Sequence, residues 1–456
     1  MSESTTIAAV STPNSAGGIG IVRISGGDAL KIAAEIFQPV SGADITQSRG
    51  YRAHFGKVVF NSQVIDEAVC LVFRAPHSYT GEDTVEISCH GGIYVTRSVL
   101  RAALESGAVP AEAGEFTKRA FLNGKIDLAE SEAVMNLISA QGEQAASAAL
   151  NTLDGKLSSK IRAAADEIIA VSAALAAWVD YPYDEIEDTS PEEMLAVLRK
   201  VRSDISEIVK SYDSGRVFTE GIDTVIVGRP NVGKSTLMNL LTGYDRSIVT
   251  DIAGTTRDIV EESVNLGGML LRIADTAGIR ETDNAVESIG VSLAKKRLER
   301  AVLVFAVFDS ASELSSEDIE ILNGCKDKLC LAVINKTDLP RKADTDIIRA
   351  VADETVEISA ANGEGADRLE AAVARLLSAS SFNPENPCLA SERQRNCCVT
   401  ALRFIDDAVN ALEGGVTLDA VNVCADCAVD ALLELTGERA SAAVVEEVFS
   451  RFCVGK

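Results

Sequence analysis

One eight-residue segment constrains the fold of this chain more than any other. Its sequence is GRPNVGKS, from Gly228 to Ser235, and it fits the pattern G-x-x-x-x-G-K-[ST]. The β-branched run 224–227 precedes it and the helix-like run 236–241 follows it. In that context, N–H groups of the turn and of the helix N-terminus can surround phosphates, Lys234 can neutralise the β and γ oxygens, and Ser235 can bind Mg²⁺. The alternative is an ordinary glycine-containing turn, against which the flanking strand and helix argue.

Three further motifs follow short β-branched runs and can complete a nucleotide site. In D-T-A-G the carboxylate of Asp275 can reach the Mg²⁺ shell, and the glycine lets the backbone approach the γ-phosphate. In N-K-T-D, Asp338 can accept from the N1 and N2 donors of guanine, which adenine does not offer, and S-A-A can close the base pocket. The set resembles the translation-factor-like GTPases and predicts a guanine nucleotide. The residues expected to contact it are Asn231, Val232, Gly233, Lys234, Ser235, Thr236, Asp275, Thr276, Ala277, Gly278, Asn335, Lys336, Asp338, Ser359 and Ala360.

Hydrolysis requires a group that orients the attacking water. Ras-like proteins place a Gln directly after D-x-x-G, whereas this chain has Ile279, whose apolar side chain cannot do this. We therefore expect the loop 247–258 to contribute Thr256 to Mg²⁺ and carbonyl groups to a monovalent cation that replaces an arginine finger. Asn231 either offers its side-chain oxygen to that cation or serves only as a turn residue. The loop residues expected at the nucleotide are Thr250, Asp251, Ile252, Ala253, Gly254, Thr255 and Thr256.

The composition and the pattern of apolar residues change along the chain, which predicts several domains. Residues 1–118 have an α/β pattern, and residues 119–216 are Ala-rich and helical. Residues 217–378 alternate short β-branched runs with helical stretches, which is typical of a parallel sheet with crossover helices. Residues 379–456 begin with a Ser/Asn/Pro-rich linker and are then helical. We therefore expect a multidomain α/β and α protein, in which a Ras-like P-loop GTPase domain is inserted into a discontinuous helical domain.

Two helices of the helical region can be located from local patterns. Apolar residues recur at helical spacing from Leu157 to Trp178 and predict one helix with a buried face. Ser190-Pro191-Glu192-Glu193 predicts the start of another, with Ser190 as the N-cap and Glu193 completing a capping box.

Charge and composition exclude some functional classes. Lys and Arg number 43 and Asp and Glu number 68, which makes the formal net charge −25. Such an acidic chain is a poor non-specific nucleic-acid coat and a poor ligand for an anionic membrane surface. We see no apolar run near the ~20 residues of a membrane span and no secretory signal. We expect a soluble cytoplasmic protein whose ten cysteines are mostly reduced thiols.

The whole chain resembles the MnmE (TrmE) family of tRNA wobble-uridine modification GTPases. The nucleotide motifs, the loop D-I-A-G-T-T-R-D, the split helical region and the C-terminal tail C-V-G-K carry the resemblance, and the tail is its most specific feature. The resemblance implies a GTP hydrolase that works with the FAD-dependent protein MnmG (GidA). Together they add an aminomethyl or carboxymethylaminomethyl group to C5 of the wobble uridine in tRNA. It also implies a homodimer, a hetero-oligomer with MnmG, and no membrane association.

The resemblance also implies ions and a water-positioning residue for GTP hydrolysis. In the family, the G domains dimerise across the nucleotide in a K⁺-dependent way, and a Glu after D-x-x-G positions the attacking water. That Glu corresponds to Glu287, which from the residues alone is a solvated carboxylate on a helix face. The implied K⁺ ligands are Asn231, Thr250, Ile252 and Thr255, and the implied Mg²⁺ ligands are Ser235 and Thr256.

The N-terminal region, by the same resemblance, is similar to the folate-binding domains of aminomethyltransferases. It is implied to form the constitutive dimer and to bind formyl- or methylene-tetrahydrofolate, whose one-carbon unit supplies the added carbon. Glu86 can hold the pterin donors by paired hydrogen bonds, and basic groups suit the folate carboxylates. Without the family, each residue is better explained as part of a surface ion pair. The implied folate ligands are Arg23, Glu86, Lys125 and Lys456.

Cys453 is the expected reactive thiol, a nucleophile toward the uridine ring or an intermediate, if a neighbour such as Lys456 lowers its pKa. The alternatives are a buried residue that holds the tail, or a lipid site. The lipid site fails because Gly455 is not aliphatic and Lys456 is not a usual last residue.

Two other functional classes are kept as alternatives. A ribosome-assembly or RNA-binding switch GTPase without modification chemistry would share every nucleotide motif, but it would normally carry a basic RNA-binding appendage. A zinc or redox protein could use Cys424 and Cys427, although a zinc site needs four ligands and no second cysteine pair has suitable spacing. We expect these two cysteines, like Cys397 and Cys398, to pack in a helical core.

Overall fold

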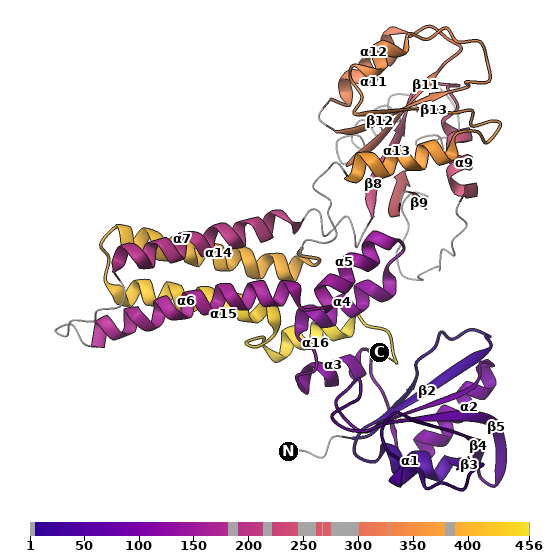
Figure 1. Ribbon diagram of the computed structural model, residues 1–456, viewed down its shortest axis with the longest axis vertical. Helices are drawn as coiled ribbons and strands as arrows, with labels where there is room; N and C mark the ends of the chain where they lie inside the picture. The colour runs from indigo at the N-terminus through magenta and orange to yellow at the C-terminus, as the bar shows by residue number, and fades with distance from the viewer. Residues whose placement is uncertain are drawn as a thin grey trace, which may run out of the picture. The chain divides into compact units, whose positions relative to one another are not determined.

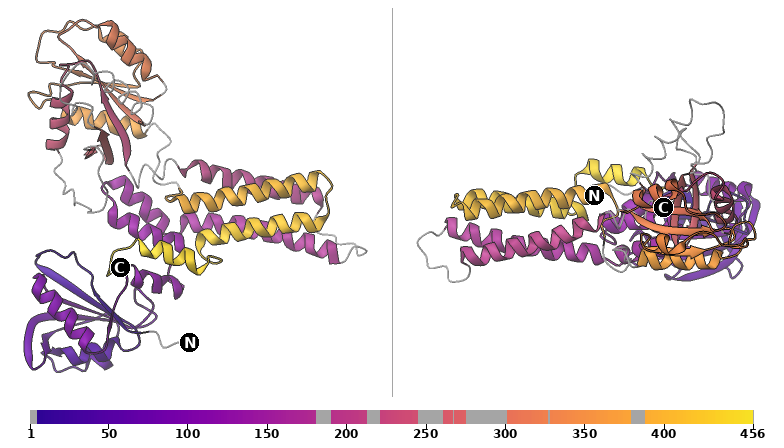
Figure 2. Two further views of the ribbon diagram at one scale, coloured as in Figure 1. Left: turned by 180° about the vertical axis from the view of Figure 1, so that it is seen from behind. Right: turned by 90° about the horizontal axis from the view of Figure 1, so that it is seen from above.

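The computed structural model describes residues 5–180, 190–212, 221–244, 261–266, 268–274, 301–326, 328–378 and 388–455 (Figures 1 and 2). The chain divides into two compact units, each made of segments that are far apart in the sequence. The first unit comprises Met1–Met135, Ser158–Leu198 and Arg403–Lys456. The second unit comprises Asn136–Leu157 and Arg199–Leu402.

The N-terminal part of the first unit is a sheet with the strand order β3-β4-β5-β6-β2-β1-β7. Neighbouring strands are antiparallel except β1 and β7, which are parallel. Helices α1 (Ala29–Ile36) and α2 (Ile93–Glu105) cover one face, where they pack on Val22 and Ile24. The alternation of side chains along β2 therefore places Arg23 on the opposite face. The strands are β1 (Ile7–Val10), β2 (Ile19–Ser25), β3 (Phe37–Pro39), β4 (Arg52–Phe60), β5 (Gln63–Phe73), β6 (Thr84–His90) and β7 (Val109–Pro110).

Helices follow this sheet along the chain. The predicted helix from Leu157 is α6 (Lys156–Asp180), and its apolar residues Leu157, Ile161, Ala165, Ile168 and Leu175 are buried, which confirms the predicted face. Ser172 Oγ on α6 lies within hydrogen-bond distance of Asn422 Oδ1 (2.6 Å) and Asp426 Oδ1 (2.7 Å), so α6 lies against α15. The first unit also contains α3 (Glu115–Leu122), most of α4 (Leu128–Ser139), α15 (Leu418–Thr436) and α16 (Ala442–Ser450).

The predicted capping box is present at the start of α7 (Pro191–Lys210). The Glu193 amide donates to Ser190 Oγ (3.2 Å), and the Ser190 amide donates to Glu193 Oε2 (2.8 Å). Two N–H groups that the helix itself cannot satisfy are thus paired by local sequence alone. Helix α14 (Glu392–Glu413) begins the final helical segment.

The second unit contains a sheet with the strand order β13-β12-β11-β8-β10-β9. Helices α9 (Lys234–Tyr244) and α13 (Ala366–Ser378) pack on one face, and α11 (Ser316–Gly324) and α12 (Thr345–Arg349) pack on the other (Figure 1). This confirms the predicted α/β class. The strands are β8 (Ile222–Val227), β9 (Glu261–Leu266), β10 (Met269–Ala274), β11 (Leu303–Asp309), β12 (Leu329–Asn335) and β13 (Glu354–Glu357).

The strands of this sheet are parallel except the edge strand β9, which is antiparallel to β10. The sequence patterns did not predict this strand. The connection from β9 to β10 is a short turn at Gly268, whose φ is +78°, and a short turn can only join antiparallel strands. Helix α5 (Glu143–Leu153) packs on this hairpin, since Asn265 Nδ2 donates to the Gln141 carbonyl (2.6 Å) and Ala148 belongs to the same core.

No helix in the described ranges combines the length and hydrophobicity needed to cross a membrane.

Candidate functional site

The loop between β8 and α9 has a backbone conformation that its glycines allow. Gly228 has φ +157°, and a Cβ there would lie 2.6 Å from the Val307 carbonyl oxygen. Gly233 has φ +98°, and a Cβ there would lie 2.2 Å from Asn335 Nδ2. The backbone contact excludes a side chain at Gly228, and the positive φ of Gly233 is one that L side chains rarely adopt, so both positions require glycine. Asn231 has a positive φ of 64° and an exposed side chain.

Lys234 crosses this loop from the first turn of α9. Its Nζ donates to the carbonyl oxygens of Gly228 (2.7 Å) and Arg229 (2.8 Å). Burial lowers the pKa of Lys234 because the charged amine loses hydration. A bound anion would offset that loss. Ser235 and Thr236 are exposed beside it at the N-terminus of α9, so amine, hydroxyl and helix N–H groups together fit phosphate oxygens and Mg²⁺.

Asn335, at the end of β12, joins two of the predicted motifs to each other. It is 2% exposed. Its Nδ2 donates to the Val232 carbonyl (2.9 Å), and its Oδ1 accepts from the Ala360 amide (3.0 Å). The glycine-rich loop and the S-A-A loop are therefore held at the same edge of the sheet by one side chain.

Asp338 lies near this edge with an exposed carboxylate. Its Oδ1 accepts a hydrogen bond from the buried Ser359 hydroxyl (2.6 Å). The carboxylate is thus oriented by the S-A-A loop while its surface stays open to a ligand, as the predicted recognition of a base requires.

Lys336 connects this edge to a residue that the sequence patterns did not single out. Its Nζ donates to the Asn231 carbonyl (2.7 Å) and to Asp309 Oδ2 (2.7 Å). Burial opposes ionisation of Asp309, but hydrogen bonds from Lys336 and the Ala311 amide and the Lys336 charge outweigh it, and its pKa is lowered. The sequence signal that could have identified Asp309 is its position, because it is the first polar residue after the apolar run of β11.

Arg229 of the glycine-rich loop also has a partner that the sequence did not reveal. Its Nε donates to Asp318 Oδ1 (2.9 Å), and Asp318 is 1% exposed. Asp318 is at the same time the third residue of α11 and completes its capping box, with Ser315 as the N-cap. The pattern S-x-x-D locates the start of that helix, but it contains no information on which distant arginine approaches it.

The remaining residues predicted at the nucleotide lie outside the described residues. They are Thr250, Asp251, Ile252, Ala253, Gly254, Thr255, Thr256, Asp275, Thr276, Ala277, Gly278 and Glu287.

The N-terminal sheet brings together two of the residues expected at a folate. Arg23 on β2 is opposite Glu86 on β6, and Arg23 Nε donates to Glu86 Oε1 (2.8 Å). The Arg23 guanidinium lies 5.4 Å from the ring centroids of both Tyr79 and Phe116. Arg23 Nη1 is buried, and among the described residues it has no hydrogen-bond partner. An unsatisfied buried donor of a charged group is costly, so this atom suits a ligand that accepts a hydrogen bond.

Lys125 is exposed and lies beside the turn that precedes β6. Its Nζ donates to the Pro76 carbonyl (3.1 Å), and its Cγ would be 3.4 Å from a Cβ at Gly81. Lys456, the fourth expected ligand, lies outside the described residues.

The C-terminal tail binds to the N-terminal part of the first unit through its backbone. The Cys453 carbonyl accepts from the Gly114 amide (3.3 Å), Val454 forms an antiparallel bridge with Ala113, and the Gly455 carbonyl accepts from Ser11 Oγ (3.1 Å). The Cys453 side chain is exposed. The alternative of a buried thiol that holds the tail is therefore wrong, because the main chain holds it.

The other cysteines give a mixed result. Cys397 and Cys398 are buried on α14, as predicted. Cys424 and Cys427 are only half-buried on α15, so the expected packing of this pair in a core is not found. Burial raises the pKa of Cys424, and Asp407 and Cys427 add to this effect. Within the described ranges no group of three or more His, Cys, Asp and Glu residues is placed to hold a metal ion.

The fold and motifs of the second unit define a P-loop GTPase domain of the α/β class, carried within a longer chain. Two family models match the chain: one for the MnmE helical domain matches residues 128–453, and one for the GTP-binding protein TrmE N-terminus matches residues 6–125. The chain is 41% identical over 456 residues to the tRNA modification GTPase MnmE of Thermoanaerobacter pseudethanolicus, covering 99% of each chain. It is 40% identical over 454 residues to that of Clostridioides difficile, again covering 99% of each. The chain belongs to the MnmE family.

The chain is also similar to a solved structure of Era from Aquifex aeolicus, at 30% sequence identity and a TM-score of 0.28. The match covers 40% of this chain and 65% of the Era chain.

Proposed function

We propose that this chain is a tRNA modification GTPase that binds and hydrolyses GTP in its second unit. The observation that carries this proposal is the position of Asn335, which holds the glycine-rich loop and the S-A-A loop at one sheet edge. Lys234 neutralises phosphate oxygens there, and Asp338 accepts hydrogen bonds from guanine. Ser235 and Thr256 would hold Mg²⁺, which offsets phosphate charge. Affinities for fluorescent GDP and ADP test the base assignment, and equal affinities would contradict it.

We propose further that a K⁺ ion activates hydrolysis, with Asn231, Thr250, Ile252 and Thr255 as its ligands. The ion would supply the positive charge that an arginine finger supplies in other GTPases. Asn231 supports this, because its carbonyl is engaged by Lys336 while its side chain is exposed. Glu287 would orient the attacking water. GTP turnover is expected to be faster in KCl than in NaCl, and equal rates would reduce Asn231 to a turn residue.

The proposed role of hydrolysis is to drive closing and opening of paired G domains, which organises a modification site. The chain would act as a homodimer together with the FAD-dependent MnmG and add an aminomethyl or carboxymethylaminomethyl group to C5 of the wobble uridine. The chain would work in the cytoplasm. Because its net charge is −25, MnmG would make most of the contacts with the tRNA phosphates. Strong, steeply salt-dependent tRNA binding by this chain alone would contradict that division of labour.

The proposed folate site consists of Arg23, Glu86, Lys125 and Lys456, and a bound formyl- or methylene-tetrahydrofolate would supply the one-carbon unit. Arg23 Nη1 has no hydrogen-bond partner in the part of the chain that the structure describes, and the same guanidinium pairs with Glu86. This combination supports a ligand with both an acceptor and donors. Binding of 5-formyl-tetrahydrofolate to the full chain, measured by calorimetry, tests the site.

Cys453 is the proposed nucleophile of the modification reaction. Its side chain is exposed on a tail whose backbone is held by Ala113 and Gly114. Cys453→Ser is expected to abolish wobble-uridine modification in the presence of MnmG while GTP turnover stays unchanged. Full modification by the variant would leave the thiol without a chemical role.

A further inference from the structure

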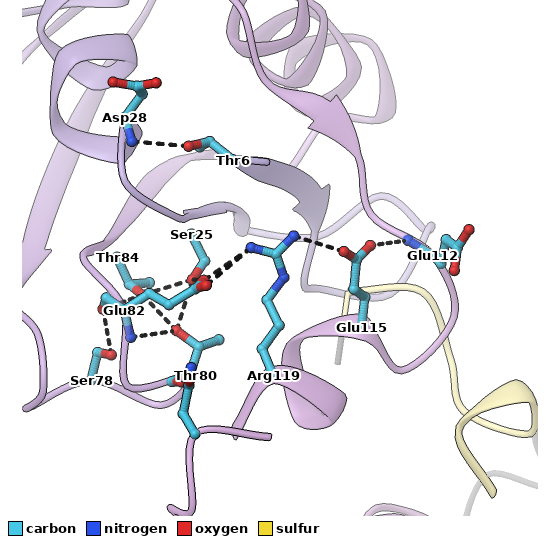
Figure 3. Close-up of polar contacts among 11 residues, drawn as sticks. Thr6, Ser25, Asp28, Ser78, Thr80, Glu82, Thr84, Glu112, Glu115 and Arg119 are labelled. Carbon is cyan, nitrogen blue, oxygen red and sulfur yellow. Dashed lines mark hydrogen bonds and ion pairs between the residues drawn. The ribbon is translucent and has the colours of Figure 1, made fainter. Parts of the chain in front are cut away.

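Glu82, in the turn between β5 and β6, accepts hydrogen bonds from several side chains (Figure 3). Both of its carboxylate oxygens accept from Arg119 Nη1, at 3.2 and 3.1 Å. Its Oε2 also accepts from Ser25 Oγ on β2 (2.9 Å), and its carbonyl oxygen accepts from Ser78 Oγ (2.6 Å). One side chain thus connects the turn to both β2 and α3.

Arg119 on α3 completes the connection and is 8% exposed. Its second terminal nitrogen, Nη2, donates to Glu115 Oε1 (2.8 Å), and Glu115 Oε2 accepts from the Glu112 amide (2.8 Å). The guanidinium therefore lies between two carboxylates, Glu82 and Glu115, as Figure 3 shows. This arrangement needs the planar fork of an arginine, because a lysine has a single charged nitrogen.

The same three elements form the surroundings of Arg23. Tyr79 belongs to the turn, Phe116 belongs to α3, and each ring centroid lies 5.4 Å from the Arg23 guanidinium on β2. The Tyr79 hydroxyl and Thr117 Oγ1 are 2.9 Å apart, which adds a second link between turn and helix. The distance between the two aromatic rings, and with it the position of Arg23, therefore depends on how α3 is held against the turn.

We propose that Glu82 and Arg119 are positioning residues for the ligand site at Arg23 and Glu86. They act by fixing the positions of the Tyr79 and Phe116 rings, which flank the Arg23 guanidinium. Arg23 Nη1 and the Glu86 carboxylate then face the ligand together. This inference rests on the proposed function, in which that ligand is a tetrahydrofolate. The ion pair supports the geometry of the site, since Arg119 and Glu82 bind each other while Glu82 also accepts from Ser25 and Arg119 also donates to Glu115.

The test measures binding of 5-formyl-tetrahydrofolate to the full-length chain, together with thermal unfolding and GTP turnover. Arg119→Lys keeps the charge but removes the fork, and it is expected to weaken folate binding about tenfold through the loss of a charge-assisted hydrogen bond. GTP turnover is expected to stay unchanged. Arg162→Lys is the matched control, because Arg162 also bridges two carboxylates, Asp127 and Glu438.

A purely structural role predicts that Arg119→Lys and Arg162→Lys both lower the melting temperature and that neither changes folate affinity at a temperature where both are folded. That result would overturn the inference. If Arg119→Lys does not fold, Glu82→Gln decides, because it keeps the size of the side chain and one acceptor while removing the charge. Unchanged affinity in Glu82→Gln would also overturn the inference. Failure of the unmodified chain to bind folate would instead refute the proposed folate site.

Discussion

Replacement of Asn335 by Ala tests how the guanine site is assembled. The substitution leaves the Val232 carbonyl and the Ala360 amide without their partners, and both residues are at most 7% exposed. A buried polar group that loses its partner costs about 1–3 kcal/mol, so the two together cost about 2–6 kcal/mol. Neither lost contact involves a ligand, so the whole cost arises within the protein.

The cost can be measured in two places. If the two loops stay together in the empty protein, it lowers the free energy of unfolding of this unit. If the loops separate, it lowers nucleotide affinity instead, by about tenfold per 1.4 kcal/mol. We therefore expect the sum of the two losses to reach at least about 2 kcal/mol. Urea unfolding without nucleotide and titration with fluorescent GDP supply the two terms.

Asp338→Asn is the control for this prediction. Its carboxylate is exposed and the replacement can still accept from Ser359, so unfolding is expected to be unchanged while GDP affinity falls. A summed loss below about 1 kcal/mol in Asn335→Ala would refute the argument that Asn335 holds the two loops.

Three further results are expected. The pKa of Asp309 is lowered in the folded protein, so its ionised form stabilises the fold above the ordinary carboxyl pKa of about 4, and this contribution is lost as pH falls through the lower folded pKa. Asp309→Asn should therefore lower the melting temperature most at pH 7, and by progressively less as the pH falls below about 4. A loss that does not depend on pH would contradict this. Gly455→Ala should release the tail, because the φ of Gly455 is +97° and a Cβ there would lie 2.3 Å from the Val10 carbonyl oxygen. Gly107→Ala is the control, because Gly107 also has a positive φ (+110°) but a Cβ there would meet open space. Hydrogen exchange of the Gly114 amide measures release of the tail, and equal exchange in both variants would argue against tail docking. Asp318→Asn should weaken GDP binding by removing the charge opposite Arg229, and unchanged affinity would show that this pair does not support the glycine-rich loop.

The sequence by itself determined the local structure of this protein and the class of its nucleotide site. The GRPNVGKS segment joins β8 to the first turn of α9 as predicted, and the capping box at Ser190 starts α7. Both features depend on residues within a few positions of each other. The buried face of α6 follows from helical spacing in the same way. The residues in the range 250–256 and at Asp275 to Gly278 and Glu287 lie outside the described residues and stay predictions.

The tertiary structure alone decided which of these local elements meet. Asn335 bonds a residue 103 positions away, Arg23 pairs with Glu86 across 63 positions, and Ser11 binds the tail across 444 positions. Strand order and the antiparallel edge strand β9 belong to the same category. Periodicity shows which face of a strand or helix is buried, but it carries no information about the neighbour that buries it. The side chains that hold the sites together, Asp309, Asp318, Glu82 and Arg119, were therefore found only when the folded chain brought their partners to them.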